Sequence, residues 1–302
     1  MTRVATIPLQ SILVSGMQRT QQQLAVSQQQ LASGTKAPDY ASLGADGVRS
    51  VSAHSLLARQ RAESIVTSQV STTLALQDSA MNAIDSSASD LRTQILTAIG
   101  TGQSSGLQSS IRAAFDQMRT ALNTTEGGVA VFGGSQSDTA PFVPGQLSDL
   151  TTADASTAFA NDQKRATARV AEGQDMTVGI LASDAAGGLF EAFKALAQNG
   201  TIGTTLTDAQ KTALGNAVSK LDNGLSQLRD VNAENGRKMA QVATLDTRAQ
   251  ARTTLLSGIV SANEDADLGQ VAVDIATQKT ALEASYSVFG QLSRMSLVNY
   301  LQ

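Results

Sequence analysis

The placement of proline limits the fold of this chain more than any other feature of its sequence. Proline stands at only four of 302 positions, namely 8, 38, 141 and 144. Because it has no amide hydrogen and its ring clashes with the preceding turn, proline bends or ends an α-helix. Residues 39–140 and 145–302 therefore allow helices of unusual length.

Apolar residues follow one another at alternating steps of three and four in both proline-free stretches. This spacing keeps one stripe of a helix facing a partner helix. One stripe spans residues 70–98 and is broken only by Gln77. A second spans residues 214–260, more than six heptads. Its polar members include Asn232, Asn235 and Asp246. They either fix the helix register, as buried Asn residues do in coiled coils, or mark the drift of an ideal helix from a 3.5-residue repeat.

Both ends of the chain carry weaker stripes of the same kind. The stripe near the start holds Leu13, Met17, Thr20, Leu24, Ser27 and Leu31, and the one near the end holds Leu268, Val271, Ile275, Gln278, Leu282, Ser285, Phe289 and Leu292. Glutamine dominates the flanks of the first stripe, in place of the Glu/Lys pairs that support an isolated helix. Such diluted stripes bury too little apolar surface to offset the entropy of ordering two helices. We therefore expect the ends to be disordered in the monomer and to fold when other subunits pack on them.

The middle of the chain has a different pattern. The apolar run 129–132 lies between glycine pairs, and residues 165–170 and 176–180 alternate around a turn at 172–175. These are strand and hairpin signals. Six of the seven phenylalanines also fall between positions 115 and 193. The sequence predicts a mainly α fold with long coiled-coil helices from both ends and a small β-containing domain inserted in the middle.

We accordingly predict five segments. They are an N-terminal axial helix segment at 1–45, the first part of a helical core domain at 46–128, an inserted outer β-containing domain at 129–182, the second part of the core domain at 183–260, and a C-terminal axial helix segment at 261–302.

Composition excludes several classes of function. Without cysteine there are no disulfides, thiolate nucleophiles or Cys zinc sites, and a single histidine cannot form a multi-histidine metal site. A net charge of −4 is not the basic footprint of a nucleic-acid-binding protein. No apolar run approaches the roughly 20 residues of a membrane span, and the N-terminus lacks the pattern of a cleaved signal peptide. We expect no catalytic residues, cofactor, metal, nucleic-acid partner or membrane insertion.

Three candidate sites are better explained as structure. His54 lies near serines and Asp46, but nothing around it resembles a nucleophile elbow, so we interpret it as a partly exposed helix histidine. The glycines of residues 127–134 lack the spacing of a nucleotide-binding loop and are typical of turns and strand ends. The acidic run 264–267 lacks the ligand pattern of a calcium loop, and Ser261 and Glu264 have the spacing of a capping box at a helix start.

Both ends of the chain resemble one family. Residues 24–36, LAVSQQQLASGTK, resemble the N-terminal signature of bacterial flagellins, a Leu- and Gln-rich helix ending in Leu-Ser-Ser-Gly-Lys. Residues 262–268, ANEDADL, followed by Leu282 to Leu301, resemble the matching C-terminal signature. After Gly34 the family usually has an Asp-Asp pair, from which PDYAS at 38–42 departs. Within the family, the stretch VFGGSQSDTAPF at 131–142 resembles the hook–filament junction branch, and filament flagellins commonly lack it.

The resemblance implies an extracellular structural protein of the bacterial flagellum, exported unfolded by the flagellar type III apparatus without a cleaved signal peptide. The implied partners are neighbouring copies of itself, the adjacent hook-associated protein, flagellin and a flagellar type III export chaperone. The implied role of the terminal stripes is packing between subunits, carried by Leu13, Met17, Leu24, Leu31, Leu268, Val271, Ile275, Leu282, Phe289 and Leu292. Two alternatives remain: a filament-forming flagellin, and an extracellular enzyme or ligand-binding protein with its site in residues 129–182.

Overall fold

The computed structural model describes residues 3–136 and 138–298, with side chains from 11 to 291 apart from residue 137. The helices are α1 Arg3–Ser33, α2 Ala45–Thr101, α3 Leu107–Leu122, α4 Ala155–Ala158, α5 Ala182–Gln198, α6 Asp208–Glu264 and α7 Leu268–Val298, with a 3-10 helix η1 at Leu147–Thr151. The strands are β1 Thr125–Glu126, β2 Val129–Ala130, β3 Thr167–Ala171 and β4 Gln174–Thr177. The predicted fold class is confirmed, because 72% of the structure is helical and its two small sheets lie mid-chain.

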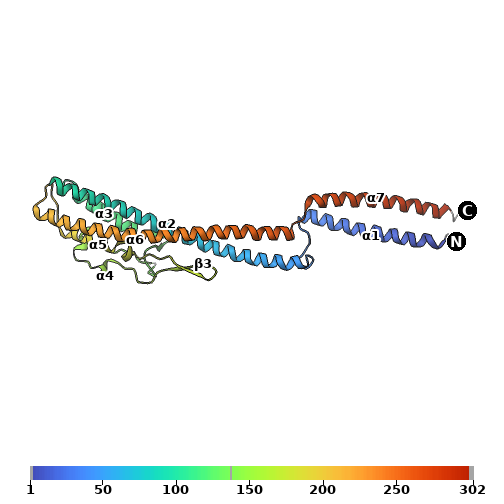
Figure 1. Ribbon diagram of the computed structural model, residues 1–302, viewed down its shortest axis with the longest axis horizontal. Coiled ribbons are helices and arrows are strands. Elements are labelled where there is room, and N and C mark those ends of the chain that lie inside the picture. The colour runs from blue at the N-terminus through green and yellow to red at the C-terminus, as the bar shows by residue number, and fades with distance from the viewer. Residues whose placement is uncertain (1–2, 137, 299–302) are drawn as a thin grey trace. The chain divides into compact units, whose positions relative to one another are not determined.

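The chain forms two compact units (Figure 1). The first, which we call the terminal unit, comprises residues 1–59 and 251–302, and the second, which we call the central unit, comprises residues 60–250. α2 and α6, each 57 residues long, contribute to both units. No helix among the described residues is long and apolar enough to cross a membrane.

The core of the central unit is built on the predicted stripes. Leu74, Met81, Ile84, Leu91 and Ile95 of α2 are at most 1% exposed. The Met81–Ala98 part of this stripe joins apolar residues of α3, α5 and α6 in one cluster. α2 and α6 are also linked by ion pairs, Arg92–Asp222 and Arg229–Asp85, the latter at 2.6 Å from Nε to Oδ1.

Phenylalanine side chains connect this core to the irregular segment between β2 and β3. Phe142 packs on Phe115 of α3 and on Phe159, with ring centroids 5.9 and 5.4 Å apart. Phe159 packs on Phe190 of α5 at 5.8 Å, and Phe115 on Phe193 at 6.0 Å. Tilted and edge-to-face pairs of this kind are favourable beyond their buried area. This packing explains why the aromatic residues are concentrated mid-chain. They hold in place a segment that has little regular secondary structure of its own.

Asn235 explains one of the polar positions in the second stripe. It is fully buried, and its Nδ2 donates a hydrogen bond to the backbone oxygen of Leu74 at 2.9 Å. Asn232 Nδ2 donates to Asn82 Oδ1 at 2.9 Å. Both therefore face α2, which favours the register interpretation over drift for these two residues.

Two hairpins form where the sequence predicts β-structure. Gly127 and Gly128 make the β1–β2 turn with φ of 58° and 89°, values that favour glycine. The β3–β4 turn consists of residues 172–173 only, because Ala171 already pairs with Gln174. It is therefore shorter than the predicted turn at 172–175. Residues 178–180 do not continue β4, because the amides of Val178 and Gly179 both donate to the Ala166 oxygen.

The predicted capping box at residues 261–264 is wrong. Ser261 and Glu264 lie in the last turn of α6, which ends at Glu264. Asp267 caps the next helix instead, because its Oδ1 accepts from the amides of Gly269 and Gln270 at 3.0 and 3.1 Å. The spacing of a capping box therefore occurs here by chance. The helix is interrupted between residues 264 and 268, where the backbone forms hydrogen bonds with the α1–α2 connection.

Candidate functional site

The candidate site is the pair of terminal helices in the terminal unit. α1 and α7 run side by side in opposite directions (Figure 1). Their contacts fix this direction, because Ser27 meets Gln278 while the earlier Gln21 meets the later Tyr286. We call the face on which the two helices meet the terminal seam, defined by the stripe residues 13–31 of α1 and 268–289 of α7.

Most of the predicted packing residues lie in the terminal seam. Val271 and Leu282 are buried, at 6% and 8% exposure. Five more are half-buried, namely Leu13, Met17, Leu24, Ile275 and Phe289. Leu31 and Leu268 are exposed at 49% and 47% and lie at the α1 end and the α7 start. The side chain of Leu292 lies outside the described residues.

Polar residues also occupy the terminal seam. Gln278 Nε2 donates to the Ser27 hydroxyl at 3.3 Å, and Ser27 is only 6% exposed. The Gln278 side-chain oxygen is buried without a partner. An unsatisfied buried acceptor costs free energy, so this position weakens the contact between the two helices. The terminal seam is therefore only partly covered in the single chain.

Other apolar side chains of α1 and α7, which the heptad pattern does not predict as packing residues, are exposed. They are Ile12, Val14, Val26, Val273, Tyr286 and Val288, with exposures from 38% to 63%. Ile12 and Val14 are two positions apart in α1, as are Tyr286 and Val288 in α7. Residues at this spacing do not share a helix face, so these side chains are spread around the helices and do not form one stripe. They add exposed apolar surface to the helix pair.

Hydrogen bonds join the two interhelical connections beside the seam. The amide of Lys36 donates to the Glu264 oxygen at 2.7 Å, and the amide of Ala266 donates to the Gly34 oxygen at 2.9 Å. Gly34 has φ of 72°, which explains the glycine that ends α1 in the sequence motif. The two signature motifs at 24–36 and 262–268 therefore lie against each other.

His54 belongs to this junction and not to a catalytic triad. Its Nε2 lies 2.8 Å from Glu264 Oε1, and its ring packs edge-on to Tyr40 with centroids 6.2 Å apart. The side chain is 45% exposed, which confirms the interpretation as a partly exposed helix histidine. Among the described residues there is no group of three His, Cys, Asp or Glu side chains that could hold a metal ion.

Comparison with known proteins identifies the fold. No protein-family model and no curated protein sequence matches the chain. Among solved structures, Bacillus cereus FlgL superposes with a TM-score of 0.58 at 15% identity, over 69% of this chain and 98% of that one. Xanthomonas campestris FlgL gives 0.56 at 13% identity, over 69% and 99%. A Vibrio parahaemolyticus protein described as a flagellar hook-associated protein gives 0.59 at 13% identity, over 71% and 96%. This chain has their fold.

Proposed function

We propose that this protein is a structural component of the bacterial flagellum that forms the hook–filament junction, linking the adjacent hook-associated protein to the flagellin filament. The observation that carries the proposal is the terminal helix pair, which buries its stripe only in part and leaves further apolar side chains exposed. The three similar structures, FlgL and a flagellar hook-associated protein by name, support a flagellar role.

Subunit packing through the terminal unit follows from the same surfaces. In the proposed assembly, Leu31 and Leu268, exposed in the single chain, contact neighbouring copies together with the other exposed apolar residues of α1 and α7. Burial of each large apolar side chain contributes about 1.5–3 kcal/mol, so these contacts add to the stability of the terminal helices. The role requires binding surfaces and no catalysis.

The stretch 131–142 supports the junction branch over a filament flagellin. Its two phenylalanines, Phe132 and Phe142, are 0% and 1% exposed and belong to the central core. Ser135 lies between these two residues in the sequence. Its backbone amide donates to the Asp162 carboxylate at 3.0 Å and its hydroxyl also donates to it, and these bonds lower the pKa of the Asp162 carboxyl. The motif is thus a built element of this protein.

Deletion of the gene tests the proposal. Cells without a junction protein should assemble hooks, fail to retain filaments and release flagellin into the medium. Electron microscopy of the cells and immunoblotting of the medium measure both results. Filaments of normal length on the deletion strain would contradict the proposal, and long filaments grown from the purified protein on flagellar seeds would assign it as a filament flagellin instead.

A further inference from the structure

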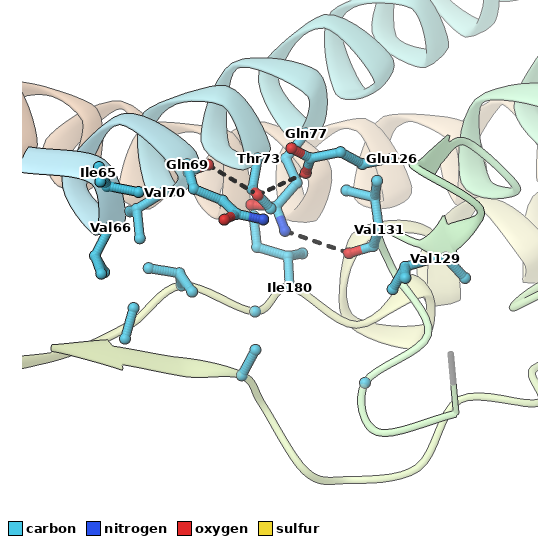
Figure 2. A pocket seen from close by; sticks show the side chains of 16 residues that line it. Ile65, Val66, Gln69, Val70, Thr73, Gln77, Glu126, Val129, Val131 and Ile180 are labelled. Carbon is cyan, nitrogen blue, oxygen red and sulfur yellow. Dashed lines mark hydrogen bonds between the residues drawn. The ribbon is translucent and has the colours of Figure 1, made fainter. Parts of the chain in front are cut away.

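A cavity of about 410 Å³ opens in the central unit, away from the terminal seam. Figure 2 shows its walls, formed by one face of α2 between Ile65 and Gln77, by β2 with the residues that follow it, and by the segments at 166–168 and 178–180. The volume falls within the range of small-molecule sites. Nothing in the proposed structural role uses this cavity.

Most of the wall is aliphatic. Val70, Ala130, Val178 and Ile180 form its buried part, with exposures of 4% to 8%. Ile65 is 69% exposed and stands at the rim. A wall of branched aliphatic side chains favours a ligand with an alkyl stem, because burying apolar surface is the main source of affinity in such pockets.

The polar side chains that line the cavity are Gln69, Thr73, Gln77 and Glu126. Thr73 Oγ1 donates to Glu126 Oε2 at 2.7 Å (Figure 2). Gln77 lies one turn further along α2 and is fully buried; its Nε2 donates to the Val131 oxygen at 3.4 Å. This bond fixes the orientation of the amide, since the reverse would place two oxygens together. The Gln77 Oε1 atom is then left without a partner, and it is buried beneath the wall of the cavity, out of reach of a ligand.

The cavity carries one negative charge and no positive one. Glu126 is the only ionisable residue among the sixteen that line it, and no described Lys, Arg or His pairs with Glu126. A carboxylate accepts hydrogen bonds and donates none, while an ammonium group donates three and accepts none. The geometry thus matches a cationic donor on an aliphatic stem.

We propose that this cavity binds an aliphatic primary amine in its ammonium form. The alkyl stem packs on Val70, Val178 and Ile180, and the ammonium group donates to the Glu126 carboxylate. Binding pairs the half-buried carboxylate with a positive charge, which a charge-assisted hydrogen bond favours. The site is independent of the role proposed for the terminal unit.

Titration of the full chain, labelled at Ile and Val methyl groups, tests the proposal by NMR at pH 7. The probes are n-hexylammonium, 1-hexanol and hexanoate, which share one stem and differ in the head group. We expect saturable shifts at the Ile65, Val70 and Val178 methyls with hexylammonium. Because a hydrogen bond to a charged group is stronger than one between neutral groups, its affinity should exceed that of hexanol about tenfold, with hexanoate weaker still. Equal affinity for amine and alcohol, or shifts confined to methyls elsewhere, would overturn the proposal.

Two variants identify the residues responsible. Glu126→Gln should remove the preference for amine over alcohol while leaving hexanol binding unchanged. The matched control is Asp90→Asn, which removes one exposed negative charge from α2 outside the cavity and should keep the preference. Ala168→Leu fills the opposite wall without touching Glu126 and should abolish binding of all three probes. Circular dichroism verifies the fold of each variant. If Ala168→Leu folds and binds the amine as the unmodified chain does, the proposed location is wrong.

Discussion

Two glycines set how closely α5 and α6 approach in the central unit. A Cβ atom on Gly224 would lie 2.6 Å from the backbone nitrogen of Leu189 and 2.7 Å from the carbonyl carbon of Gly188. A Cβ atom on Gly188 would likewise lie 2.8 Å from the Gly224 Cα. These are backbone contacts, which cannot move aside as a flexible side chain can. The absence of a side chain at both positions is therefore part of the packing.

We predict that Gly224→Ala destabilises the central unit by about 1–3 kcal/mol, the usual cost of overpacking a core. The matched control is Gly215→Ala in the same helix, where an added Cβ meets nothing within 4 Å. That change should stabilise the unit by roughly 0.5–1 kcal/mol through helix propensity. Urea unfolding followed by phenylalanine near-UV circular dichroism measures both. A stable Gly224→Ala would show that α5 and α6 can separate without loss.

Sequence could identify positions but not their partners at this scale. Gln77 was visible as the single polar break in the first stripe, yet its contact with Val131 joins residues 54 positions apart. Gly224 gave no signal at all, because an isolated glycine in a helical pattern does not show what approaches it. Local pattern records which face a residue occupies, and only the tertiary fold determines what covers that face.

The long helices could be predicted from sequence because heptad spacing and helix-ending glycines are local. α1 ends at Ser33 before Gly34, and α2 ends at Thr101 before Gly102. The sequence predicts a helix start at residues 261–264, a few residues before the observed break between α6 and α7. Its exact position could not be predicted, because it depends on hydrogen bonds to residues 34–36, some 230 positions earlier in the chain. Non-local bonds of this kind leave no periodic trace in the sequence.

The terminal seam supports a prediction about one side chain of α7. Leu282→Glu should prevent the subunit packing that we propose while sparing the central unit. It removes a buried leucine, which costs about 1.5–3 kcal/mol, and places a carboxylate in the seam. The control Thr280→Glu adds the same charge at an exposed position of the same helix and should leave the α1–α7 contact intact.

The aromatic residues allow the two units to be followed separately in this experiment. All three tyrosines, at positions 40, 286 and 300, lie outside residues 60–250, whereas six of the seven phenylalanines lie inside them. Tyrosine fluorescence should therefore change in Leu282→Glu, while phenylalanine near-UV circular dichroism should not. Loss of the phenylalanine signal would contradict the separation, since it would mean that the terminal seam supports the central fold.

The two units of the whole molecule differ in how much apolar surface each buries. The main core cluster, which links α2, α3, α5 and α6, lies wholly in the central unit. In the terminal unit the buried apolar side chains among those described are small in number: Ala53, Leu57, Leu256, Val271 and Leu282. Segments with few buried apolar contacts open locally at low free-energy cost. The units should therefore differ in stability even though both are helical.

Brief proteolysis of the purified monomer tests this difference, because cleavage requires the chain to open locally. We expect trypsin to cut after Lys279 of α7 well before it cuts after Lys220 of α6. Both are exposed lysines within long helices, so the sites differ mainly in the unit that holds them. Mass spectrometry of a time course gives the two rates. Faster cutting at Lys279 that disappears on assembly would indicate that other subunits supply the missing core of the terminal unit. Equal rates at the two lysines would mean that α1 and α7 alone form a stable helix pair, and the terminal stripes would then not need a neighbour to fold.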